Sequence, residues 1–81
     1  MASIRNVVLF QAEGCHLCEK ARGVLADELG DDFDEVDITG DDALEARYRE
    51  WLPVVEIDGE RAFVYFVDPA ALRRRLTQSQ R

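Results

Sequence analysis

The sequence is short of positive charge and of long apolar runs. Ten basic side chains stand against 17 acidic ones, which gives a formal net charge of −7. This balance argues against a nucleic-acid partner, because phosphate binding needs a basic face. It also argues against docking on an anionic membrane. No apolar run approaches the roughly 20 residues of a membrane-spanning helix.

The chain also lacks internal repeats, low-complexity stretches and linkers. The early apolar run at residues 7–10 is too short for the apolar region of a signal peptide. We therefore expect a cytoplasmic protein, in a compartment where thiols are normally reduced. Hydrophobic residues are 47% and charged residues 33% of the 81 residues, a globular composition. The expectation is a single domain over residues 1–81 and a monomer.

Apolar periodicity predicts alternating strands and helices. Strands are expected at residues 5–10, 33–38, 54–57 and 61–67. Helices are expected from about residue 15 to 29, from about 42 to 50, and from 69 onward. The order β-α-β-α-β-β-α predicts an α/β fold whose four-stranded mixed sheet is flanked by helices on both faces. The first two strands are expected to be parallel, because a long helix connects them.

Three local patterns predict a turn and two helix caps. Asp58-Gly59 is typical of a two-residue hairpin turn with positive φ at both positions. Thr39 with Asp42 resembles a capping box for the short helix. Asp68 before a proline predicts the N-cap of the last helix.

The chain has only two cysteines, Cys15 and Cys18, and they lie where the first strand gives way to the first helix. Cys15 is expected at the helix N-terminus, where unpaired N–H groups and the helix dipole favour a thiolate. We expect an exposed Cys15 with a pKa lowered to about 3.5–7.5. Cys18 is in register with Ala21 and Leu25 and is expected to be buried. In such a pair Cys15 attacks a disulfide and Cys18 resolves the mixed disulfide.

Other interpretations of the cysteine pair stay open. A structural staple is disfavoured because a four-residue loop removes little chain entropy. No bound metal is expected, because His16 is wedged between the cysteines and zinc needs four ligands. A metal or an iron–sulfur cluster shared across a dimer, and inert buried cysteines, are further alternatives. Cys-X-X-Cys near a βαβ pattern favours redox chemistry.

The chain resembles the small glutaredoxin-like proteins of the thioredoxin fold over nearly its whole length. It is similar to a bacterial branch with a C-H-L-C or related C-x-L-C motif. The stretches that carry the resemblance are Leu9-Phe10, Cys15-His16-Leu17-Cys18-Glu19-Lys20-Ala21, Leu52-Pro53-Val54-Val55, Ile57-Asp58-Gly59 and Asp68.

The resemblance implies a substrate groove beside the cysteines. It makes Pro53 a cis-proline facing the pair, and it places the Leu52 backbone where an extended substrate strand can pair. His16, Leu17 and Asp68 complete the expected groove.

Two departures from glutaredoxins concern the electron donor. Tyr65-Phe66-Val67 stands where glutaredoxins carry Gly-Gly before the Asp that caps the last helix, and a Lys upstream of the motif is absent. Both departures argue against glutathione as the electron donor, and the negative charge of the chain argues against this anionic thiol as well. The expectation is no bound cofactor, with a low-molecular-weight thiol or a reductase as donor.

Two residues near the motif each allow two interpretations. A protonated His16 would stabilise the Cys15 thiolate. The favoured alternative is an exposed, neutral His16 ring that has little effect on the Cys15 thiolate. Trp51 either borders the groove or packs beneath the short helix with Tyr48, and packing is favoured.

The sequence therefore predicts a thiol–disulfide oxidoreductase acting on a disulfide-containing protein or a small-molecule thiol substrate. Cys15 is the nucleophile and Cys18 the resolving thiol. The competing hypothesis is a non-catalytic thioredoxin-fold module that binds a partner or senses redox state through the same pair.

Overall fold

The computed structural model describes residues 6–78 of the chain. Its strands are β1 (Val7–Gln11), β2 (Asp34–Asp37), β3 (Val54–Ile57) and β4 (Glu60–Val64). Its helices are α1 (His16–Leu29), α2 (Asp42–Tyr48), the short 3-10 helix η1 (Arg49–Trp51) and α3 (Pro69–Gln78). The predicted order of strands and helices is confirmed. Arg5, with which the first strand was predicted to begin, lies outside the described residues.

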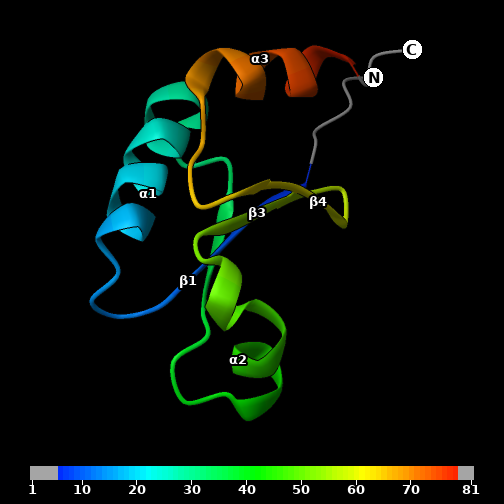
Figure 1. The fold of residues 1–81 in the computed structure, drawn as a ribbon. Coiled ribbons are helices and arrows are strands. Elements are labelled where there is room, and N and C mark those ends of the chain that lie inside the picture. Colours follow the sequence, from blue (N-terminus) through cyan, green and yellow to red (C-terminus); the bar gives the residue numbers. More distant parts are fainter. Residues whose placement is uncertain (1–5, 79–81) are drawn as a thin grey trace.

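The four strands form one mixed sheet in the order β2-β1-β3-β4. β1 and β2 are parallel, as the helical connection between them predicts. β3 runs antiparallel to both β1 and β4. α1 and α3 pack together on one side of the sheet, and α2 lies away from them at its other side (Figure 1). The sheet is thus covered on both faces.

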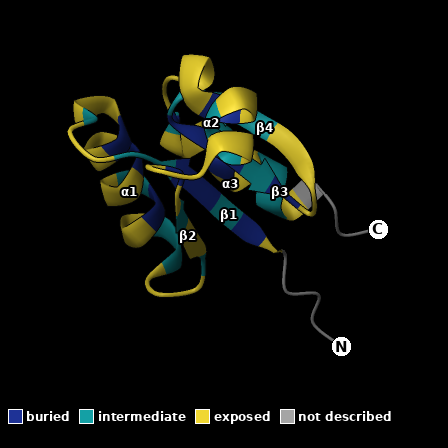
Figure 2. Cartoon of the chain, turned by 90° about the horizontal axis from the view of Figure 1, so that it is seen from below, coloured by how far each residue is buried: buried dark blue, intermediate teal, exposed yellow. Residues whose placement is uncertain are grey.

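β1 supplies side chains to both faces of the sheet. Val7 and Leu9 join the core under α1 and α3, while Phe10 joins the core under α2. The alternation follows the two-residue period of a strand. Figure 2 shows β1 as a largely buried strand between exposed helix surfaces. A strand buried on both faces reads as an unbroken apolar run, which is why residues 7–10 carry no polar alternation.

The hairpin after β3 confirms the predicted turn, but β4 ends earlier than expected. Asp58 and Gly59 have φ of 55° and 84°. β4 ends at Val64, not at residue 67, because Tyr65 adopts a left-handed φ of 69°. Its N–H donates to the Pro53 carbonyl oxygen at 3.0 Å, after which the chain turns toward α3.

The N-cap of α2 corrects a second prediction. Asp41, not Thr39, caps the helix, and its carboxylate accepts from the Leu44 N–H at 3.1 Å. The Thr39 hydroxyl instead accepts from the Glu13 N–H at 3.2 Å. Thr39 therefore ties the loop after β2 to the loop that leads into the cysteine motif.

Tyr48 joins α2 to the sheet through a polar contact at the edge of the core. Its ring stacks on Phe10 with centroids 4.1 Å apart, and its hydroxyl donates to Glu56 at 2.8 Å. Burial, and after it the hydrogen bond to Glu56, raises the pKa of Tyr48 above its usual value. The folded state therefore holds the phenolic proton more tightly than the unfolded chain does.

This raised pKa predicts a loss of stability in alkali. The contribution is complete below the unfolded tyrosine pKa of about 10 and falls as the pH rises through the higher folded value. The urea midpoint of the wild type should therefore drop more steeply above pH 10 than that of Tyr48→Phe. Near pH 7, Tyr48→Phe should cost about 1 kcal/mol for the lost hydrogen bond. Equal slopes above pH 10 in the wild type and Tyr48→Phe would contradict the assignment.

Candidate functional site

Cys15 is the N-cap of α1. It follows Gly14, whose φ of +77° lets the chain turn from β1 into the helix, a conformation that favours glycine. The Cys15 sulfur accepts from the Cys18 N–H at 3.1 Å, so one of the free N–H groups of the helix end points at the sulfur. The end of a helix at which N–H groups are free favours negative charge on the group that caps it.

The two cysteines form a disulfide with Cα atoms 5.2 Å apart. Cys18 is 2% exposed and packs on the inner face of α1, as predicted. Cys15 was predicted to be exposed and is instead partly buried. Cys15 thus stays partly accessible, whereas Cys18 is sheltered.

An open cleft of about 470 Å³ adjoins Cys15. Its lining comes from the loop before α1, the loop after β2, η1 and the residue after it. The lining residues are Ala12, Glu13, Gly14, Cys15, Thr39, Arg49 and Leu52. We call this the cysteine cleft. Arg49 also pairs with Glu45 at 3.1 Å, which balances its charge at the rim.

Leu52 and Pro53 occupy different depths beside the cysteine cleft. Leu52 is partly buried and lines the cleft with Cys15. Pro53 lies beneath the surface, less than 2% exposed, and the Leu52–Pro53 peptide bond is cis. Of the two, it is Leu52 that offers side-chain surface to a ligand in the cleft.

The other residues predicted for the groove are spread around it. The His16 side chain is exposed, and within residues 6–78 it makes no hydrogen bond or ion pair. Leu17 is 48% exposed and lines a second pocket instead of the core face of α1. Asp68 lines neither pocket; its carboxylate accepts from the Ala71 N–H at 3.0 Å and caps α3.

Loss of the Asp68 cap should loosen the first turn of α3. Asp68→Ala should lower the free energy of unfolding by about 1 kcal/mol, because the first-turn N–H loses its acceptor. Asp68→Asn keeps an acceptor oxygen and should stay within a few tenths of a kcal/mol of wild type. Urea unfolding of the three proteins measures both values. If Asp68→Asn lost as much free energy of unfolding as Asp68→Ala, the negative charge of Asp68, and not its capping hydrogen bond, would stabilise α3.

The second pocket lies between α1 and the segment that joins β4 to α3. It measures about 200 Å³ and is lined mainly by apolar side chains: Leu17, Lys20, Ala21, Val24, Tyr65, Phe66, Val67 and Pro69. We call this the apolar pocket. The sequence pattern identifies residues 65–67 as a departure from glutaredoxins but does not predict that they line a pocket. The replacement of glycines by aromatic residues at this position is the feature of the sequence that indicates an apolar surface.

The position of Trp51 differs from the favoured prediction that it packs beneath the short helix with Tyr48. It does not pack beneath α2; it is 40% exposed, and its ring lies 6.0 Å from the ring of Tyr65. The Arg61 guanidinium lies over the Trp51 ring at 6.0 Å. Trp51 therefore lies at the surface beside Tyr65, which lines the apolar pocket.

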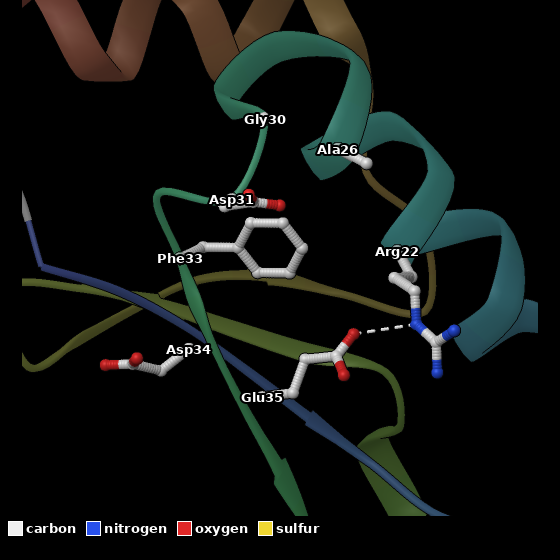
Figure 3. Close-up of a pocket in the computed structure, with 7 residues that line it drawn as sticks. All are labelled: Arg22, Ala26, Gly30, Asp31, Phe33, Asp34 and Glu35. Carbon is white, nitrogen blue, oxygen red and sulfur yellow. Dashed lines mark ion pairs between the residues drawn. The ribbon is translucent and has the colours of Figure 1, made fainter.

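A third hollow, of about 410 Å³, lies at the far end of α1 against β2 (Figure 3). Arg22 and Glu35 form an ion pair of 2.7 Å at its rim. None of its lining residues belongs to the cysteine motif or to the segments at 51–53 and 65–69. The chemistry of the cysteines thus lies elsewhere on the molecule.

No group of three or more His, Cys, Asp or Glu residues within residues 6–78 is placed to hold a metal ion. No helix in the same range is long and apolar enough to cross a membrane.

The sheet, the flanking helices and the cysteine pair at the start of α1 define a protein of the thioredoxin fold. A family model confirms the resemblance: residues 6–77 match the glutaredoxin-like domain (DUF836), so the chain belongs to this family. At this coarse level, the fold and the Cys-X-X-Cys pair support a thiol redox role.

Relatives and solved structures agree with the family. The Mycobacterium tuberculosis protein Rv0508 is 33% identical over 91% of this chain and 84% of its own length. The crystal structure of protein XcR50 from X. campestris superposes with a TM-score of 0.78, at 33% identity, over 90% of this chain and 97% of that one. Glutaredoxin 1 from Francisella tularensis shares the fold at 19% identity, with a TM-score of 0.60 over 91% of this chain and 94% of its own.

Proposed function

We propose that this protein is a thiol–disulfide oxidoreductase, with Cys15 as the nucleophile and Cys18 as the resolving thiol. One observation carries the proposal: Cys15 caps α1, with the Cys18 N–H on its sulfur and the Cys18 sulfur sheltered beside it. A thiolate at this position is activated by the helix end, and its partner is within bonding reach.

The proposed reaction balances as one two-electron exchange. The Cys15 thiolate attacks one sulfur of the substrate disulfide, and the first substrate thiolate leaves and takes a proton from water. Cys18, deprotonated by water, then attacks the Cys15 sulfur of the mixed disulfide, and the second substrate thiolate leaves and takes a proton from water. The protein ends as the Cys15–Cys18 disulfide, and the substrate is reduced to two thiols. A low-molecular-weight thiol or a reductase in a reducing compartment such as the cytoplasm would return the pair to the dithiol.

Two observations weigh against glutathione as that donor. Tyr65 holds a left-handed φ, and Phe66 is 67% exposed, so side chains stand where glutaredoxins present glycine backbone to the tripeptide. The formal charge of −7 also opposes an anionic thiol.

The test is the reduction of insulin, or of a small aromatic disulfide, by the fully reduced protein. The proposal requires one disulfide reduced per Cys15–Cys18 pair, and it requires that the reaction depend on Cys15. A reversible pair with no rate above that of free thiols would favour the competing redox-sensing module.

A further inference from the structure

We propose that the apolar pocket seats a large apolar side chain that neighbours the reactive cysteine of a protein substrate. The inference rests on the proposed function, because it names the substrate class of the same cysteine pair. The preferred substrate is then an extended, neutral or basic protein segment and not a small anionic thiol.

The first argument is the position of the pocket. Leu17, between the two cysteines, forms part of its wall. On the opposite wall Tyr65 approaches Trp51, with ring centroids 6.0 Å apart, and Trp51 precedes Leu52 on the cysteine cleft. An apolar surface thus continues from the cleft at Cys15 to the pocket. A segment that offers its disulfide to Cys15 can extend along this surface to the pocket.

The second argument is exposure. The large apolar side chains that the structure leaves most exposed are Leu17 (48%), Trp51 (40%), Tyr65 (46%) and Phe66 (67%). All four lie at the pocket or on the surface that leads to it. Scattered apolar side chains are ordinary, but a cluster beside a reactive group marks a contact surface. Aromatic residues are also the side chains that most often anchor protein partners.

The third argument is size. The pocket holds about 200 Å³. Ligand pockets for whole small molecules run from about 300 to 1,000 Å³, whereas a cavity of about 150 Å³ accepts a benzene ring. The space therefore suits one large side chain. The Lys20 stem can lie along such a side chain and keep its ammonium group in water.

The fourth argument is charge complementarity. The chain carries a net charge of −7, which attracts a basic segment, does not oppose a neutral one and repels anionic glutathione. The glycine-like φ of Tyr65 turns the chain so that residues 65–67 line the pocket where glutaredoxins show bare backbone. Shape and charge thus favour the same occupant.

The test compares three disulfides in single turnovers with pre-reduced protein. Two are symmetrical peptide disulfides with Lys at both ends, in which the cysteine is flanked on both sides by Leu or by Ser. The third is glutathione disulfide. The Leu peptide should react about tenfold faster than the Ser peptide, because tenfold corresponds to ~1.4 kcal/mol, part of what full burial of a Leu side chain supplies.

Variants at Phe66 connect the preference to the pocket. Phe66→Ser should lower the ratio of the Leu-peptide rate to the Ser-peptide rate from about ten to about one. Phe66→Tyr keeps the ring and should retain the preference. Equal rates for the two peptides with wild type, or a glutathione disulfide rate that matches the Leu peptide, would overturn the inference.

A binding measurement separates this inference from the proposed function. The same peptides with serine in place of cysteine should shift the amide NMR signals of Leu17 and Phe66, in the Leu form only. Docking without any Cys15-dependent reduction would refute the proposed function and keep the docking site. Cys15-dependent reduction of both peptides without these NMR shifts would refute the docking site and keep the proposed function.

Discussion

Cys15→Ser is expected to reduce the disulfide-reduction rate to the background of free thiols. A serine hydroxyl at the same N-cap keeps an oxygen near the Cys18 N–H, so α1 should remain capped and the fold intact. The hydroxyl is not ionised near neutral pH, whereas the chemistry needs a thiolate. The measurement is the single-turnover reduction of insulin by pre-reduced protein, with urea unfolding as the check on folding.

Cys18→Ser gives the complementary result for the same pair. It keeps the nucleophile and removes the resolving thiol, so attack should proceed and stop at a Cys15 mixed disulfide, visible by mass spectrometry as one substrate chain bound per protein. The two assigned roles would be wrong if Cys15→Ser turned over fully, or if Cys15→Ser formed a mixed disulfide at Cys18.

Leu25→Ala is expected to cost about 2–5 kcal/mol of stability. Leu25 is fully buried on α1 and packs into the core shared with α3 and the sheet. Truncation removes transfer free energy and leaves a cavity that a close-packed core fills only in part. At about 0.05–0.15 kcal/mol per residue, an 81-residue chain has a total stability of only about 4–12 kcal/mol. The variant should therefore unfold at a much lower urea concentration than the wild type.

Leu17→Ala provides a control on the same helix. Leu17 is 48% exposed, so its truncation should change the free energy of unfolding by no more than about 0.5 kcal/mol. Urea titration followed by circular dichroism compares the two variants. Comparable losses would mean that Leu17 supports the fold, and its assignment to the apolar pocket would fail.

Much of the fold could be predicted from local patterns along the chain. The apolar run at 7–10 predicted a buried strand, and Asp58-Gly59 predicted the hairpin turn that the structure shows. Patterns of this kind succeed because side-chain periodicity and allowed φ values are set by the residues themselves. Thr39 shows the limit, since Asp41 was the better-placed cap and the hydroxyl found a partner 26 positions away at Glu13.

The end of β4 shows a second limit. Residues 61–67 are apolar enough to read as one strand, yet Tyr65 turns the chain three residues early. Its hydrogen bond to Pro53 joins segments that are distant in sequence. Val67 is buried as a loop residue against the α1–α3 core. Apolar composition alone does not distinguish a strand residue from a buried loop residue.

By itself the sequence determined the order of the elements, the hairpin and the place of Cys15 and Cys18 at a strand-to-helix junction. These depend on neighbours within a few positions, where spacing and backbone preference decide. Only the tertiary structure decided that Trp51 and Tyr65 approach each other and that Leu17 faces a pocket instead of the core. Those contacts join residues from four separate elements and loops, and no local pattern records which surfaces the packed sheet brings together. Because the chain has only two cysteines, the sequence alone identifies the candidate redox residues. The packing of the elements decides which side chains form the surface around them.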